Sequence, residues 1–209
     1  PAVIVEPRGR VEGDGANADI YANDEDGSAA AVVYALSALA RAVTLRLAQH
    51  ELNIVGVTGS AGKTSTKDLI ATIFRSVGET VAPPGSFNNE IGLPYTALRC
   101  DEHTQYLVAE MSARGIGHIR HLTDITAPRI GVVLNVGSAH LGEFGSRENI
   151  AKAKGELVEA LPTAAEGGVA VLNADDPFVA AMAPRTHAKV VYYSTETRRG
   201  GACLLYTSP

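Results

Sequence analysis

The sequence has too few cysteines and basic side chains for several classes of protein. Its two cysteines, Cys100 and Cys203, cannot build a disulfide framework or a four-cysteine metal site. The chain carries 18 Lys and Arg against 23 Asp and Glu, so its net charge of -5 at pH 7 offers no broad basic surface to a nucleic-acid backbone. We expect a protein of the reducing cytoplasm that does not bind nucleic acid.

Long apolar runs and an N-terminal leader are absent as well. The richest apolar run, from Ala29 to Ala40, contains Ser37 and is followed by Arg41, whereas a membrane-spanning helix needs about 18 apolar residues or more. The chain does not start with Met, and it does not open with the charged and then apolar segment of a secretory leader. We therefore expect no membrane span, and we expect the 209 residues to be a fragment that holds one or two domains.

The chain changes character at Ser28. Residues 1–26 are polar and rich in Gly, Asp and Asn around two short apolar patches, 2–5 and 19–22, which we interpret as remnants of strands. After Ser28, apolar residues recur every three or four positions, a spacing typical of one face of a helix. The residues on this expected face are Val32, Val33, Leu36, Leu39, Ala40, Val43 and Leu47.

From about residue 52 to 195, strand and helix signals alternate. Short runs rich in Val, Ile and Leu predict strands at 53–57, 105–111, 129–136, 169–172 and 188–193. Helical spacing predicts helices at 69–77, in a short piece after Pro94, at 117–124, at 146–161 and after Asp176. Ser146 is expected to cap the helix at 146–161. Such alternation favours an α/β domain with a mainly parallel sheet flanked by helices. Residues 196–209 break the pattern, so we assign this tail no element and consider a truncation artefact as its origin.

The sharpest motif is the Gly-rich turn between the first of these strands and the following helix, within residues 55–66. Such a turn directs backbone N–H groups and the positive end of a helix dipole at one point, which suits a phosphate chain. Gly59 and Gly62 permit the tight backbone, while Lys63 supplies a mobile positive charge and the Thr64 hydroxyl suits Mg²⁺. Val57 stands where the common phosphate-loop pattern has its first glycine. The motif predicts nucleotide binding but does not separate kinases, GTPases, ATPases and ligases.

Seven segments, in order along the chain, give it a resemblance to a known family. They are Thr58–Thr64, Gly85–Pro94, Glu110–Ala113, Asn135–Leu141, Phe144–Ser146, Ala153–Glu156 and Leu172–Pro177. Together they resemble the motifs of the Mur ligases over residues 52–193. The resemblance implies that residues 52–195 are the P-loop NTPase-like central ATP-binding domain. It also implies that residues 1–51 are the end of the N-terminal UDP-sugar-binding domain with a connecting helix, and that the third domain is absent.

Mur ligases join an amine to a peptide carboxylate with ATP, through an acyl phosphate. Within the family, Asn88–Gly92 is most similar to the ligases that add D-Ala-D-Ala to UDP-N-acetylmuramoyl-tripeptide, a cytoplasmic step of peptidoglycan precursor synthesis. The alternatives are another Mur ligase, a folylpolyglutamate synthetase-like ligase or, for this chain by itself, a non-catalytic ATP-binding module. We expect a monomer that does not ligate alone, because the domain that carries the incoming amine is absent.

The resemblance also assigns roles to individual residues. It implies Lys63, Lys154 and His140 as catalytic residues, with Lys154 carbamylated by CO₂ into an anion. The contacts of Mg²⁺ are expected at Thr64, Glu110 and His140. The expected contacts of ATP are Thr58, Gly59, Ser60, Ala61, Gly62, Lys63, Thr64, Asn88, Asn89 and Asn135.

Structural interpretations compete at several of these positions. Asn88 and Asn89 either contact the γ-phosphate or the substrate carboxylate, or only shape their loop as Asx turns. Asn135 and Asp176 either help to bind the nucleotide or support the fold, and we rank the structural role first. Asp176 is expected to be the N-cap of a helix that starts at Pro177.

Overall fold

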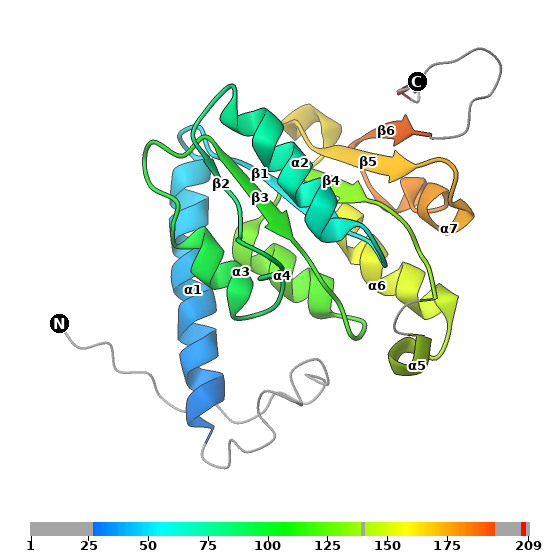
Figure 1. The fold of residues 1–209 in the computed structure, drawn as a ribbon, viewed down its shortest axis with the longest axis horizontal. Helices are drawn as coiled ribbons and strands as arrows, with labels where there is room; N and C mark the ends of the chain where they lie inside the picture. Colours follow the sequence, from blue (N-terminus) through cyan, green and yellow to red (C-terminus); the bar gives the residue numbers. More distant parts are fainter. Residues whose placement is uncertain (1–26, 139–140, 195–205, 208–209) are drawn as a thin grey trace.

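The structure is a computed structural model that describes residues 27–138, 141–194 and 206–207 (Figure 1). The apolar patches expected at 2–5 and 19–22 lie outside these residues. The helices are α1 Ser28–Ala48, α2 Lys63–Arg75, α3 Gly92–Ala97, α4 His118–Thr126, α5 Leu141–Phe144, α6 Arg147–Glu159 and α7 Pro177–Ala180, with 3-10 turns at Ala164–Glu166 and Ala183–Arg185. The strands are β1 Asn53–Thr58, β2 Thr80–Val81, β3 Tyr106–Glu110, β4 Ile130–Val133, β5 Val169–Asn173, β6 Lys189–Tyr193 and β7 Tyr206–Thr207.

A single seven-stranded sheet with the order β2-β3-β1-β4-β5-β6-β7 organises these elements. β1 to β6 are parallel, and β7 pairs antiparallel with β6. The predicted fold class, a mainly parallel sheet flanked by helices, is confirmed. The short strands β2 and β7 were not predicted, and β7 lies in the tail to which the sequence assigned no element. Because β3 and β4 flank β1 on opposite sides, the winding of the chain reverses beside β1, which is where α/β folds place their ligands.

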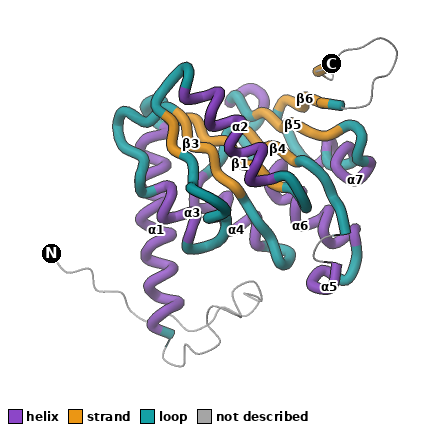
Figure 2. The backbone as a smooth tube through the Cα atoms, in the orientation of Figure 1, coloured by secondary structure: helices purple, strands orange, loops and turns teal. Residues whose placement is uncertain are grey.

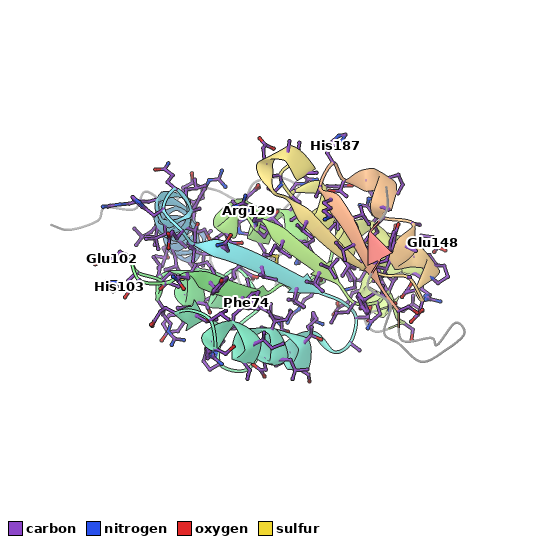
Figure 3. All side chains as sticks on the ribbon, turned by 90° about the horizontal axis from the view of Figure 1, so that it is seen from above. Phe74, Glu102, His103, Arg129, Glu148 and His187 are labelled. Atoms are coloured by element: carbon purple, nitrogen blue, oxygen red, sulfur yellow. The ribbon has the colours of Figure 1, made fainter. Side chains whose placement is uncertain are left out.

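The two faces of the sheet are covered differently. Successive strand residues point to opposite faces, and on one face Val55, Val57 and Val108 pack with residues of α2, including Ala71 and Phe74. Phe74, which Figure 3 labels, stacks on Tyr106, with ring centroids 4.5 Å apart. The other face packs on α1, α3, α4, α6 and α7, so that α2 lies in front of the sheet in Figure 1 and α1, α4 and α6 lie behind it.

Helix α1 forms where the spacing predicts it, but the expected packing face was partly wrong. Its buried residues are Ala31, Val33, Ser37, Ala40 and Thr44. Of the residues expected on the packing face, Val32 and Leu39 are more than half exposed. These small side chains allow α1 to approach the domain closely. The size of the side chains therefore determines which face of α1 is buried, more than their hydrophobicity does.

Helix α1 also differs from the expectation that no segment is apolar enough to span a membrane. By length and composition alone, α1 is the one helix of the described residues that satisfies this criterion. The core helix of a folded domain satisfies it too, and α1 is tied to α4 through polar contacts. Thr44 Oγ1 donates to the carbonyl of Ile125 at 3.0 Å, and the Arg41 guanidinium donates to the carbonyl of Asp124. These contacts make α1 part of the packing of the domain.

Two predicted N-caps are confirmed. The Ser146 hydroxyl accepts a hydrogen bond from the Asn149 amide at the start of α6. The Asp176 carboxylate accepts hydrogen bonds from the amides of Phe178 and Val179, with Pro177 as the first residue of α7. Both caps satisfy backbone N–H groups that the first turn of a helix leaves without partners.

Candidate functional site

The candidate site lies at the carboxyl edge of the sheet, where the loops that follow β1, β3 and β4 gather (Figure 2). Figure 3 shows Glu148 of α6 toward this end, and Glu102 and His103, which precede β3, at the opposite end. The topology therefore places the phosphate loop close to two other predicted site residues, Glu110 after β3 and Asn135 after β4.

The phosphate loop connects β1 to α2 and is shaped by its glycines. Gly62, the N-cap of α2, has φ 81°, a left-handed conformation that favours glycine. A side chain at Gly59 would begin 2.9 Å from Cβ of Leu134, so the backbone of this loop crosses β4 closely. The first backbone N–H groups of α2 have no partner within the helix, and they carry the positive end of its dipole. This geometry can hold an anion.

Asn135 and Thr58 hold the loop in place. The Asn135 Oδ1 atom accepts from the amides of Ser60 and Ala61, both at 2.9 Å, and its Nδ2 atom donates to the carbonyl of Ala61 at 3.1 Å. The Thr58 hydroxyl is fully buried and donates to the carbonyl of Met111. Both side chains are thus committed to the backbone, which agrees with the structural role ranked first for Asn135.

Lys63 begins α2 and its ammonium folds back over the loop. Nζ donates to the carbonyl of Gly59 at 2.8 Å. Burial lowers the pKa of Lys63 below its ordinary value of 10.5, while the negative charge of Glu110 acts in the opposite direction. Lys63 and Glu110 are therefore electrostatic neighbours, although they come from different elements of the chain.

Glu110 ends β3 with its side chain only 1% exposed. Its Oε2 atom accepts from the Thr64 hydroxyl at 2.9 Å, and its Oε1 atom accepts from Nδ2 of Asn88 at 2.7 Å. A buried carboxylate is costly unless its oxygens have partners, and here both have one. The carboxylate is oriented toward the first turn of α2, where a phosphate-bound cation would lie.

The paired asparagines have different contacts, and only those of Asn89 correspond to one of the two interpretations given above, the Asx turn. Asn88 contacts Glu110, whereas Oδ1 of Asn89 accepts from the amides of Ile91 and Gly92 at 3.3 and 2.9 Å at the start of α3. Asn89 therefore shapes the turn as an Asx residue does.

Lys154 lies in α6 and is 4% exposed. Burial and, to a smaller extent, the positive charge of Lys63 lower its pKa from 10.5 to about 8. Among the described residues, no hydrogen-bond acceptor or carboxylate pairs with its amine. His140 lies outside the described residues, so the structure does not describe its place in the site.

Sequence reasoning assigned no role to Lys67 and Glu156, and it made Asp176 an N-cap without finding its contact with the loop after β4. Lys67 is fully buried in α2. The Glu156 carboxylate accepts from the amides of Gly117 and Arg120 at the start of α4, at 2.6 and 3.0 Å. Oδ2 of Asp176 accepts from the Val136 amide at 2.7 Å and so fixes the loop after β4. The available signal for Lys67 was its position within the apolar stripe of a helix. For Glu156 the signal was its place in the Ala153–Glu156 motif.

Comparison with known proteins identifies the family. The Mur ligase middle domain model matches residues 57–203. The chain belongs to the Mur ligase family. It is 55% identical to UDP-N-acetylmuramoyl-tripeptide–D-alanyl-D-alanine ligase of Mycobacterium leprae over 93% of this chain and 37% of that protein. The corresponding ligase of Escherichia coli is 42% identical over 61% of this chain and 28% of its own length.

Solved structures agree with this family. MurF of Thermotoga maritima, crystallised in complex with ADP, has a TM-score of 0.71 and 34% identity over 91% of this chain and 40% of that one. MurF of Acinetobacter baumannii has a TM-score of 0.70 and 32% identity over 78% and 37% of the two chains. FPGS of L. casei, at 15% identity and a TM-score of 0.52, shares the fold alone. The chain spans 37% of the length of the ligases of Mycobacterium leprae and Mycobacterium bovis that it matches.

Proposed function

We propose that this chain is the ATP-binding part of a cytoplasmic ligase that joins D-Ala-D-Ala to UDP-N-acetylmuramoyl-tripeptide. The observation that carries the proposal is the meeting of the phosphate loop with a buried carboxylate: the Thr64 hydroxyl, in the first turn of α2, contacts Glu110 at the end of β3. The identity to named ligases of this specificity supports the choice of substrates.

The residues present fit Mg²⁺. A hydroxyl and a carboxylate are hard oxygen donors, and Mg²⁺ commonly takes one or two carboxylates together with waters and substrate phosphates. Thr64 and Glu110 would hold the ion, and His140 is the further residue that the family resemblance implies. The bound ion would neutralise phosphate charge during transfer. Among the described residues no cluster of three or more His, Cys, Asp or Glu side chains exists, which agrees with a metal held partly by its substrate.

The remaining residues of the site position and compensate charge. Phosphorylation of a carboxylate brings two anions together, so the site needs cations and fixed geometry more than a covalent partner. We propose that the first amides of α2 and the Lys63 ammonium bind the β- and γ-phosphates. Asn135 and Thr58 keep the loop in the shape that this requires. The acyl phosphate would then be attacked by the amine of D-Ala-D-Ala.

We further propose that Lys154 reacts with CO₂ to form a carbamate. The ammonium first loses one proton to water. The neutral amine then attacks the carbon of CO₂, an N–C bond forms as one C=O π bond breaks and leaves its electron pair on oxygen, and a second proton leaves the nitrogen, so that a cation becomes an anion. With a pKa of about 8, about one amine in ten is neutral at pH 7, against about one in three thousand at the ordinary value. Lys63, the nearby cation, would be the natural partner of the new anion.

Nucleotide binding is testable on the chain itself. Titration calorimetry with Mg-ADP should give weak binding to the 209 residues, and Lys63→Ala should weaken it about tenfold or more, because a phosphate loses its charge-assisted contact. Circular dichroism should show that this variant remains folded. Equal binding by both chains would remove the phosphate loop from the proposal.

We expect ligation to require a longer chain. ADP release with and without both substrates should be compared for the 209 residues and for a version extended at the C-terminus to the length of its relatives. We expect substrate-dependent release from the extended protein only, and Lys63→Ala should reduce it by about 10³-fold. Ligation by the 209 residues alone would refute the expectation that they are non-catalytic.

A further inference from the structure

Lys67 is a second lysine of α2, one turn after Lys63, and its side chain is completely buried. Nζ donates to the carbonyls of Pro83 at 2.7 Å and Gly85 at 2.9 Å, and it lies 2.8 Å from Oδ1 of Asp68. All three donors of the ammonium therefore have a partner. Two of these partners are backbone atoms of the loop between β2 and α3.

That loop has few hydrogen bonds, although Pro83 at its start is buried and the Phe87 ring packs edge-on against Tyr95 of α3, with ring centroids 6.0 Å apart. Residues 83–87 belong to no helix or strand, and Pro83 and Pro84 have no N–H group to donate. Among the described residues, the hydrogen bonds to the backbone of 83–87 come from Lys67 alone. The loop becomes tied to the sheet only from Asn88 onward, whose carbonyl accepts from the amide of Ser112 at 3.0 Å.

Through Lys67, hydrogen bonds and backbone segments form a closed ring around the candidate metal site. Lys67 ties α2 to the loop, and Asn88 of that loop donates to one oxygen of Glu110. The other oxygen of Glu110 accepts from Thr64, which lies one turn before Lys67 in the same helix. The hydrogen bonds among these residues are 2.7–2.9 Å long, and the backbone provides the remaining links, from Gly85 to Asn88 and from Thr64 to Lys67.

Burying an ammonium costs desolvation free energy, and an apolar side chain of similar volume would fill the same space without that cost. An apolar side chain at position 67 would leave the carbonyls of Pro83 and Gly85 without this donor, and the exposed segment after Pro83 would lose its hydrogen bond to α2. We propose that Lys67 is a positioning residue that holds the 83–87 segment against α2, so that Asn88 keeps Glu110 oriented for Mg²⁺. This inference rests on the proposed function only in its last step.

The test uses the 209-residue chain and compares Lys67→Met with two controls. Lys67→Met keeps the length of the side chain and removes its donors. Asp68→Asn removes the negative charge beside Lys67 but leaves both carbonyl bonds, and Lys152→Met removes an exposed lysine elsewhere. Hydrogen exchange of metal-free protein reports the tether, and Mg²⁺ dependence of ADP binding reports its consequence.

We expect Lys67→Met to speed amide exchange at residues 85–89 by about tenfold or more, while β1 and β3 keep their protection. ADP affinity without Mg²⁺ should stay within about threefold, and the Mg²⁺ concentration for half-maximal enhancement should rise about tenfold, as is typical when a group that orients a metal ligand is lost. Both controls should behave like the native chain. Asn88→Ala should reproduce the Mg²⁺ effect without loosening residues 85–87.

Unchanged exchange at 85–89 in Lys67→Met would overturn the tether. Faster exchange with an unchanged Mg²⁺ requirement would overturn the positioning role. If Lys67→Met does not fold, Lys67→Gln, which retains one donor group, should show the same two effects at smaller size, and their absence there would overturn the proposal equally. A native chain that binds no ADP would contradict the proposed function, while the exchange experiment would still decide the tether.

Discussion

Lys67 in α2 and Lys154 in α6 are both almost completely buried, yet their surroundings are opposite. Lys67 has two carbonyls and a carboxylate within hydrogen-bonding distance. Lys154 has no such partner among the described residues. Burial lowers its pKa, and the positive charge of Lys63 lowers it further. The comparison teaches that burial alone does not define the role of a lysine. The fully paired ammonium of Lys67 ties α2 to a loop, whereas the Lys154 amine, which has no partner among the described residues, is the one for which we propose a reaction.

The largest expected effect is that of Lys154 on turnover. In the extended ligase, Lys154→Ala should lower ADP release by about 10²-fold or more, because an anion of the site is lost. Short carboxylates such as acetate should restore part of the rate by supplying that anion. Lys152→Ala, two positions away on the exposed side of α6, is the matched control. Equal loss in Lys152→Ala, or no rescue of Lys154→Ala, would contradict a special role for Lys154.

A smaller effect, of opposite sign for the two lysines, is expected in the free energy of unfolding. At pH 7 without CO₂, Lys67→Met should destabilise the chain by about 1–3 kcal/mol, because buried carbonyls lose their donors. Lys154→Met should stabilise it by up to about 3 kcal/mol, because an unpaired buried cation is removed. Denaturant unfolding of both variants at matched protein concentration measures the pair.

The pH dependence of the Lys154→Met effect identifies its cause. A lysine whose pKa falls from 10.5 unfolded to about 8 folded destabilises the native state fully below pH 8. The penalty decreases as the pH rises toward 10.5 and disappears above it. The advantage of Lys154→Met should shrink over this range. An advantage that does not change with pH would point to better packing, and equal signs for Lys67→Met and Lys154→Met would contradict the comparison.

Much of the fold was predictable because its signals are local. Apolar runs located β1 and β3 to β6, and Ser146 and Asp176 marked helix starts through capping, which depends on neighbours in sequence. The two-residue strand β2 is too short for periodicity to detect. The prediction of the packing face of α1 was partly wrong for a different reason. Its partners α3 and α4 lie far along the chain, and they determine which side of α1 is buried.

The candidate site was predictable where a residue's role follows from its own motif. Gly62 and Lys63 stand where a phosphate loop requires them. The roles of Asn135 and Lys67 depend on contacts with the backbone of distant segments, which no spacing in the sequence reveals. For the same reason, the sequence did not distinguish Asn88, which reaches Glu110, from Asn89, which shapes a turn.

The most direct test of the contrast between the two lysines is NMR spectroscopy of the chain in ¹³C-bicarbonate. We predict one slowly exchanging carbamate signal that grows as the pH rises through 8, where the neutral amine of Lys154 becomes the major form. The signal should persist in Lys67→Met and disappear in Lys154→Met. A carbamate that survives in Lys154→Met, or none in the native chain at any pH, would contradict the assignment of Lys154 as the reactive lysine.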